Sequence, residues 1–365
     1  MRIFLLLRLS LALVASALAA MAESATARSE FPNAVQPQLA VGAGNQVWLA
    51  YGSGKQVFAA RSDDGGRTFS AGVKIMESPG LRLGMRRGPR IAVDASGVTV
   101  TVMTTDLLSF HSTDGGRSWS DPVIVNDVPQ SAREGLHDLA GNGKGGLFAT
   151  WLDLRSGKME LWAATSRDGG KTWGSNQPLY RSPGGSICEC CHPSALFDAD
   201  GNLAVMWRNS LNGSRDLWMI TRPAGQAEFG AARKLGEGTW NLQGCPMDGG
   251  RIVVFGGGDF GAVWQRAGEV FLVHGSGAET RIGQGKQPVV ALVKGAPVVW
   301  WQQGPDLVST ERTPQPIHEA RFPVVISLPN GNGVVLAYER TVAGQNPTAV
   351  VVERLAENAA VVSNN

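Results

Sequence analysis

The chain has 365 residues, of which 43% are hydrophobic and 18% are charged, so it can form one large domain and is not disordered. Its 47 glycines and 19 prolines show no collagen period and indicate a turn-rich globular protein. The formal net charge is +2, and without Arg2 and Arg8 of the N-terminal segment the chain is neutral, which gives no electrostatic reason to expect nucleic acid or an anionic membrane as a partner.

The first 22 residues have the layout of a secretory signal peptide. Arg2 precedes an apolar run, and Ala20-Met21-Ala22 forms a small-x-small cleavage site. A membrane anchor is the alternative, but Arg8 interrupts the apolar run and no stop-transfer flank follows. We therefore expect residues 23–365 to form a single mature domain without a membrane span. Its location would be secreted, in the bacterial periplasm, where disulfides persist.

Three segments with one pattern follow at residues 62–69, 112–119 and 166–173. Each reads Ser-x-Asp-Gly-Gly-x-Ser/Thr-aromatic, and the copies begin 50 and then 54 residues apart. Glycine supplies the positive φ of a tight turn, and the Asp and Ser/Thr side chains can bond the turn amides. The closing aromatic can pack between neighbouring sheets. The pattern predicts hairpin turns in a repeated β architecture.

These segments resemble the Asp boxes, Ser-x-Asp-x-Gly-x-Thr-Trp, of bacterial neuraminidases, also called sialidases, and related β-propellers with BNR repeats. The resemblance implies a sialidase-like propeller in which the Asp boxes face away from the active site. It implies little about activity, because Asp boxes also occur in non-hydrolytic relatives.

A second repeat consists of seven strand starts, most of them marked by proline: Gln36-Pro37, Gly88-Pro89, Leu136-His137, His192-Pro193, Cys245-Pro246, Gln287-Pro288 and Phe322-Pro323. A turn and a second apolar strand follow each start, and no helical periodicity of useful length is present, which indicates an all-β fold. We predict a β-propeller of seven four-stranded blades around a central channel, with a six-bladed, sialidase-like ring as the alternative. The seventh blade has only three obvious strands, and residues 30–32 could close the ring as its fourth.

In such a propeller, the loops that lead into each first strand open on one face around the channel, and functional residues should lie there. We call these loops lead-in loops. The most unusual sequence of the chain, Cys188-Glu189-Cys190-Cys191-His192, falls on the lead-in loop of blade four. The remaining cysteine, Cys245, falls on that of blade five. This coincidence is the strongest functional signal in the sequence.

Thiolates and imidazole are ligands for Cu(I) or Zn(II), so this cluster is a candidate metal centre. Its candidate ligands are Cys188, Cys190, Cys191, His192 and Cys245, together with Met247 and His137. Structural disulfides are the alternative that the even number of cysteines favours, because four cysteines in an oxidising compartment can pair, for example Cys245 with one of the other three. Thiol redox chemistry is a third.

The resemblance to neuraminidases also implies a hydrolytic alternative. In that family an arginine cluster clamps the substrate carboxylate, a tyrosine activated by glutamate is the nucleophile, and an aspartate is the acid/base. The positions that correspond are Arg90, Arg208, Arg266 and Arg340 for glycan binding, and Tyr338, Glu339 and Asp153, or Asp106, for catalysis. The family's Phe/Tyr-Arg-Ile-Pro motif is missing, since residues 89–91 share only its Arg-Ile.

The sequence therefore favours an exported Asp-box propeller whose Cys/His cluster is a binding, metal or thiol-redox centre at the channel mouth. Its partner would be a metal, a small molecule or a glycan. A scaffold that binds a protein partner and holds only structural disulfides is a further alternative. Arg82, Arg86 and Arg87, on the lead-in loop of blade two, are interpreted as a solvated loop or as an attraction for an anionic ligand.

Overall fold

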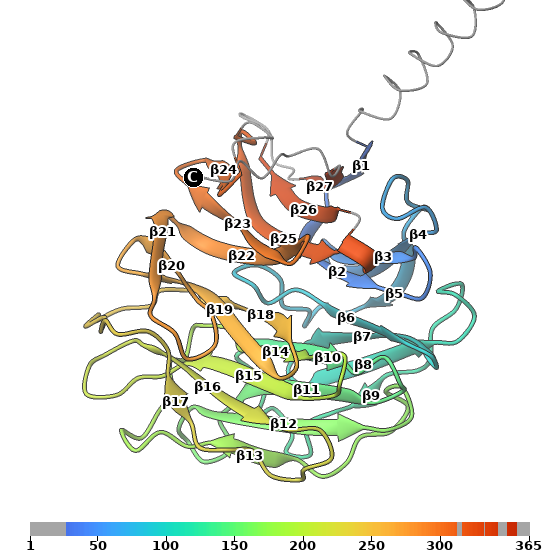
Figure 1. Ribbon diagram of the computed structural model, residues 1–365. Helices are drawn as coiled ribbons and strands as arrows, with labels where there is room; N and C mark the ends of the chain where they lie inside the picture. Colours follow the sequence, from blue (N-terminus) through green and yellow to red (C-terminus); the bar gives the residue numbers. More distant parts are fainter. Residues whose placement is uncertain (1–26, 312–315, 332, 342–348, 356–365) are drawn as a thin grey trace, which may run out of the picture.

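The structure, a computed structural model, is a ring of seven antiparallel sheets (Figure 1). It describes residues 27–311, 316–331, 333–341 and 349–355, so the predicted signal peptide lies outside the described residues. The strands are joined by turns and one short 3-10 helix, Pro329–Gly331. Over the described ranges, no helix is long and apolar enough to cross a membrane. The prediction of an all-β, seven-bladed propeller is confirmed, and the six-bladed alternative is excluded.

The blades follow one another along the chain. Blade 1 contains β2 (Val35–Val41), β3 (Val47–Ser53), β4 (Gln56–Ser62) and β5 (Val73–Glu77). Blade 2 contains β6 (Arg90–Asp94), β7 (Gly97–Met103), β8 (Leu107–Ser112) and β9 (Val123–Ile124). Blade 3 contains β10 (His137–Gly141), β11 (Leu147–Asp153), β12 (Glu160–Ser166) and β13 (Gln177–Tyr180). Blade 4 contains β14 (Ser194–Phe197), β15 (Leu203–Arg208), β16 (Leu217–Arg222) and β17 (Arg233–Lys234).

Blade 5 contains β18 (Arg251–Gly256), β19 (Asp259–Arg266), β20 (Glu269–Val273) and β21 (Thr280–Gln284). Blade 6 contains β22 (Lys286–Val293), β23 (Ala296–Gln303) and β24 (Asp306–Ser309), and an isolated bridge joins Leu307 to Ile317 at its outer edge. Blade 7 contains β25 (Ala320–Ser327), β26 (Val334–Arg340), β27 (Ala349–Leu355) and, as its outer strand, β1 (Ala27–Pro32).

The ring is closed by strands from the two ends of the described chain. β1 pairs antiparallel with β27, from Ala27 opposite Arg354 to Pro32 opposite Ala349, and Figure 1 shows the blue β1 beside the red β27. The predicted closure by residues 30–32 is therefore confirmed. The first strands β2, β6, β10, β14, β18, β22 and β25 each contact the next around the ring, and β25 contacts β2. They surround the central channel.

The apolar core is divided into layers between neighbouring blades. Phe148 and Leu161 of blade 3, for example, share one cluster with Leu203 and Trp207 of blade 4. The aromatics that close the three Asp-Gly-Gly turns pack in such layers, as predicted: Phe69, Trp119 and Trp173.

The three Asp-Gly-Gly turns have the same internal hydrogen bonds. In the first, the Gly66 N–H donates to Ser62 Oγ (2.8 Å), and the Thr68 N–H and hydroxyl donate to the two Asp64 carboxylate oxygens (2.9 and 2.6 Å). Gly66 has φ +84°, and a Cβ there would lie 2.6 Å from the Val335 side chain of the preceding blade. Glycine is therefore required both for the turn and for the contact between blades.

One predicted strand start is displaced. The first strand of blade 5 begins at Arg251, five residues beyond Pro246. The intervening residues turn, because Met247 and Gly250 have φ +55° and +70° and the Asp248 carboxylate accepts the Gly250 N–H at 3.2 Å. Gly249 lies so close to His192 that a Cβ would be 1.8 Å from the His192 carbonyl oxygen.

We predict that Phe31→Ala destabilises the ring closure. The half-buried Phe31 ring on β1 lies with its centroid 5.1 Å from Tyr51 and 6.2 Å from Phe69, both in blade 1. Its loss should lower the free energy of unfolding by about 2 kcal/mol. Glu30→Ala is the matched control, because Glu30 makes only long ion pairs to Arg28 (3.5 Å) and Arg340 (3.8 Å) and its removal should cost less than about 0.5 kcal/mol. Urea unfolding of both variants measures the difference, and equal stabilities would contradict the role of Phe31.

Candidate functional site

Three cysteine side chains meet on the lead-in loop of blade 4. The Cys188 sulfur lies 3.7 Å from the Cys190 sulfur and 3.6 Å from the Cys191 sulfur, and all three sulfurs lie within 4.8 Å of one another. Their side chains are buried, with 1%, 7% and 1% relative exposure. All four cysteines of the chain are free in the structure. The cluster of Cys188, Cys190 and Cys191 is called the thiol group below.

Backbone contacts from blades 4 and 5 hold the thiol group. Cys188 donates its N–H to the Arg208 carbonyl at 3.0 Å, which ties the loop to the end of β15. The Arg208 guanidinium donates to the carbonyls of Asp248 (3.0 Å) and Gln265 (2.9 Å) in blade 5. Met247, on the lead-in loop of blade 5, packs against the sulfurs. The thiol group therefore lies at the junction of the two blades, and it does not include Cys245 of the second cysteine-bearing loop.

The thiol group favours a single thiolate. Hydrogen bonding with Cys190 and Cys191 lowers the pKa of Cys188, and the positive charge of Arg215 contributes. The hydrogen bond to Cys188 raises the pKa of Cys190, and burial raises the pKa of Cys191. Of the three thiols, Cys188 is therefore the one whose thiolate form the surroundings favour.

The other predicted ligands lie outside the thiol group. Cys245 is exposed. His192 is buried, and its pKa is lowered well below its usual value by burial and by the charges of Arg251, Arg86 and Arg90, so its ring is neutral. His137 is also buried, its Nε2 lies 3.1 Å from Thr101 Oγ1, and burial lowers its pKa to about 3. Of the predicted non-cysteine ligands, the structure brings only Met247 to the sulfurs.

The sequence interpretation of Arg86 as part of a solvated loop is wrong, because this side chain is buried across the channel mouth. Arg86 is 4% exposed, and its guanidinium donates to Gln287 Oε1 (2.6 Å) and to the Pro323 carbonyl (3.0 Å). It thus joins blade 2 to blades 6 and 7. Gly84, Met85 and Arg86 all have positive φ, and this strained backbone segment directs the Arg86 side chain inward. Apart from its glycines, the segment has no sequence feature that indicates a buried arginine.

The four arginines predicted to bind a glycan are each engaged within the chain. Arg90 donates to the carbonyls of Gly88 and Arg86 and pairs with Asp138, while Arg208 is bound as described above. Arg266 is paired through two nitrogens with Glu279. Arg340 is partly exposed and lies 3.8 Å from Glu30. These arginines belong to blades 2, 4, 5 and 7, and Arg90 and Arg208 are buried.

The predicted pair Tyr338 and Glu339 is separated by the alternation of β26. Tyr338 is 1% exposed in the apolar layer between blades 6 and 7, and its hydroxyl donates to Glu353 at 2.9 Å. Burial and the Glu353 charge raise the pKa of Tyr338. Glu339 instead accepts the Gln36 N–H (2.8 Å) and pairs with Arg321 (3.0 Å). The Tyr338 hydroxyl and the Glu339 carboxylate therefore have different partners, since adjacent strand residues point to opposite faces.

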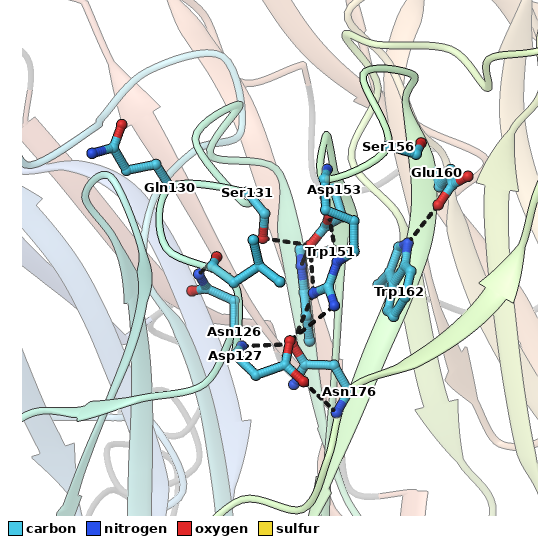
Figure 2. A network of polar contacts seen from close by, with 12 residues as sticks. Asn126, Asp127, Gln130, Ser131, Trp151, Asp153, Ser156, Glu160, Trp162 and Asn176 are labelled. Carbon is cyan, nitrogen blue, oxygen red and sulfur yellow. Dashed lines mark hydrogen bonds and ion pairs between the residues drawn. The ribbon is translucent and has the colours of Figure 1, made fainter.

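Asp153 is the acceptor at the centre of a polar network in blade 3. Figure 2 shows Ser131 and Trp151 directed at its carboxylate, with hydrogen bonds of 2.7 and 2.8 Å. Arg155 donates to both Asp153 oxygens, at 2.9 and 3.0 Å, and its guanidinium carbon lies 3.6 Å from the Trp162 ring centroid. Asp153, predicted from the sequence as an acid/base, is fully buried, and in this structure its carboxylate holds Ser131, Trp151 and Arg155 together. Asp106 is likewise bound, by Asn126 (2.7 Å) and the Gln130 N–H (2.6 Å).

Comparison with known proteins finds similarity at the level of fold. No protein-family model matches the chain, and no curated protein matches it in sequence. Solved structures that resemble it are sialidases and related β-propeller proteins. Hadza microbial sialidase Hz136 has a TM-score of 0.42 and 17% identity to this chain. The match covers 64% of this chain and 50% of the Hz136 chain. YCF48 from Cyanidioschyzon merolae has a TM-score of 0.47 and 12% identity over 90% of this chain and 98% of that one. Trypanosoma rangeli sialidase has a TM-score of 0.45 and 10% identity over 78% of this chain and 55% of that one.

The fold and the site define a seven-bladed β-propeller with a buried thiol group at the junction of blades 4 and 5. The catalytic and glycan-binding assignments remain predictions, and each of their side chains has a partner inside the chain.

We predict that Asp153→Asn destabilises the protein by about 3 kcal/mol at neutral pH, because it leaves the Arg155 charge without its buried partner. Burial by itself would raise the pKa of Asp153, but hydrogen bonds from Arg155, Ser131 and Trp151 lower it overall. The stability that Asp153 contributes is therefore present above the unfolded-state pKa of about 3.9 and is lost as the pH falls through the folded-state pKa.

Urea unfolding of the wild type and the variant between neutral and acidic pH measures this effect. The difference between the two should be constant above about pH 5 and shrink below about pH 4. Asp127→Asn is the control, because Asp127 also contacts Arg155 but is about half exposed, and it should cost less than about 1 kcal/mol. A difference that grows on acidification would contradict the assignment.

Proposed function

We propose that the protein binds a thiophilic metal ion, Cu(I) in the first place and Zn(II) in the second, through Cys188, Cys190 and Cys191. The observation that carries the proposal is the spacing of the sulfurs. Three sulfurs bound to one ion at about 2.3 Å in tetrahedral geometry lie about 3.8 Å from one another. The Cys188 sulfur is 3.6 and 3.7 Å from the other two, so these contacts need little rearrangement to hold an ion.

The chemistry of the donors supports Cu(I). The thiol group contains sulfur alone, and the side chain packed against it is Met247, whose thioether is also a soft donor. Soft thiolate and thioether ligands select Cu(I), whereas structural zinc sites usually have four Cys or His ligands. His192 and His137 lie outside the group, so a zinc site would lack its usual fourth ligand.

Local charge favours deprotonated sulfur. Cu(I) with three thiolates has two negative charges, which are costly to bury unless they are compensated. Arg215 lowers the pKa of Cys188, and Arg208 acts in the same direction on Cys191. The Met247 N–H donates a hydrogen bond toward the Cys190 sulfur. The site therefore offers positive charge and N–H donors to a metal-thiolate group.

In this proposal the propeller is a rigid scaffold of the Asp-box type, and the protein is exported to the periplasm by residues 1–22. Cys245 is exposed and stands two residues before Met247, beside the site. It is assigned no ligand role, which makes it the matched control for the buried cysteines.

We predict that the protein, handled without oxygen, binds one Cu(I) ion in competition with a chromogenic Cu(I) chelator. Cys188→Ser or Cys191→Ser should weaken this binding roughly 100-fold or more, since even residues behind a metal ligand contribute 10–100-fold. Cys245→Ser should bind as the wild type does. X-ray absorption of the loaded protein should give three sulfur neighbours at about 2.3 Å.

Thiol counting in the unfolded protein, with and without reductant, separates the metal centre from its alternatives. Four reactive thiols and tight Cu(I) binding support it. A stable disulfide among the three buried cysteines, with no metal bound after purification, would leave only structural disulfides. A disulfide that forms reversibly between Cys245 and the thiol group would favour redox chemistry instead.

A further inference from the structure

The central channel contains a cavity that the thiol group does not use. Its volume is about 340 Å³, and it extends along the first strands of all seven blades, from the level of Arg90 on β6 to Val41 on β2 and Ser327 on β25. Such a volume falls at the lower end of the range of about 300–1,000 Å³ of small-molecule sites. The cavity is therefore large enough for a small organic ligand.

The lead-in end of the cavity is covered by buried side chains. Arg86 reaches from blade 2 to Gln287 and Pro323, and Arg86, Gln36 and Gln287 are 4%, 4% and 5% exposed. The side-chain amide of Gln36 donates to Glu339 and that of Gln287 donates to the Met247 carbonyl, so these side chains are held in place. A ligand would therefore enter from the opposite face, where the Asp-Gly-Gly turns lie. This is the face away from the thiol group.

The closed end of the cavity has more positive than negative charge. Asp138 shares its carboxylate between Arg90 (3.2 Å) and Arg251 (3.3 Å), and it also accepts the Ala195 N–H (3.0 Å). Arg86 is also buried; burial and the charges of Arg251 and Arg90 lower its pKa, whereas Asp248 and Glu339 act in the opposite direction. Glu339 is already paired with Arg321. Three guanidinium groups thus face two carboxylates, which leaves one positive charge in excess.

Arg251 brings a charged group to the cavity. It lines the cavity, and its side chain is 16% exposed. Its second terminal nitrogen, Nη2, is buried without a hydrogen-bond partner among the described residues, which is costly for a charged group. An anion in the cavity that drew Nη2 into a hydrogen bond would relieve that cost. Ser194, beside it on β14, also lines the cavity and has a hydroxyl.

The walls of the cavity are apolar. They are formed by aliphatic side chains at the same levels of the first strands, among them Leu39, Ile91, Leu139, Ile252, Val289 and Val324. In a site with apolar walls and a few polar groups at one end, the polar groups orient the head of a ligand, and burial of its apolar body stabilises the complex.

We propose that the channel binds a small monoanionic amphiphile, a carboxylate with an aliphatic body, whose head group accepts hydrogen bonds from Arg251 at the closed end. The proposal is independent of metal binding, because the thiol group lies outside the cavity lining.

We predict that octanoate binds the wild-type protein at least about tenfold more tightly than octanol, which has the same aliphatic body and no charge. Octylamine, which has the opposite charge, should bind more weakly than octanol. Isothermal titration calorimetry of the three probes measures the order. Equal affinities of octanoate and octanol, a preference for octylamine, or no binding of octanoate up to about 1 mM would overturn the proposal.

Two variants locate the site. Arg251→Gln should reduce the affinity for octanoate to that for octanol, while Arg90 still pairs with Asp138. Ala291→Phe, on β22, should fill the cavity and abolish binding of both probes. Circular dichroism and urea unfolding establish that each variant folds, and if Ala291→Phe does not, the Arg251→Gln comparison decides. Unchanged binding of octanoate by folded Arg251→Gln would contradict the assigned head-group site.

Discussion

The structure depends on the packing of each sheet against the next. No blade buries both of its faces by itself, and the apolar side chains of each are covered only when its two neighbours are in place. The layer between blades 7 and 1 is built like the others, but it joins the two ends of the described chain, with Phe31 and Val350 of blade 7 against Tyr51 of blade 1. Closure by β1 therefore completes the last layer and covers the outer edge of β27. The loops of the lead-in face are positioned by this ring.

The lead-in face is held together by polar contacts that run across the channel. Met247 touches the thiol group, its carbonyl accepts from Gln287 (2.7 Å), and Gln287 accepts from Arg86 (2.6 Å), whose guanidinium reaches the Pro323 carbonyl. A continuous series of contacts thus links blade 5 to blades 6, 2 and 7. Because Arg86 is buried and charged, it is stable only while these acceptors remain in place. The same contacts that close the channel fix the Met247 side of the thiol group.

The sequence predicts the ring because its signals are local and repeated. The Asp-Gly-Gly turns need positive φ and short side-chain hydrogen bonds, so their pattern is visible in eight residues, as Ser62 to Phe69 shows. Cys188, Cys190 and Cys191 could be predicted together because they share one loop. Cys245 could not be excluded from the group, because the turn at residues 247–250 that sets its position depends on contacts with blades 4 and 6. The burial of Arg86 and the partner of Tyr338 likewise depend on strands far away in the sequence.

The buried arginines of the lead-in face differ from a substrate clamp in the partners of their donors. A substrate clamp requires guanidinium groups whose donors are free to meet a carboxylate, yet Arg90 and Arg208 donate to backbone carbonyls and are 2% and 1% exposed. A nucleophilic tyrosine must reach its substrate, and Tyr338 is enclosed between two blades. The thiol group requires no such freedom, because its sulfurs come from four consecutive residues whose backbone is fixed by Arg208 and whose open side is covered by Met247. The proposed metal centre would need preorganised donors and a compensating charge, and at the junction of blades 4 and 5 the ring holds three buried sulfurs close to Arg208 and Arg215.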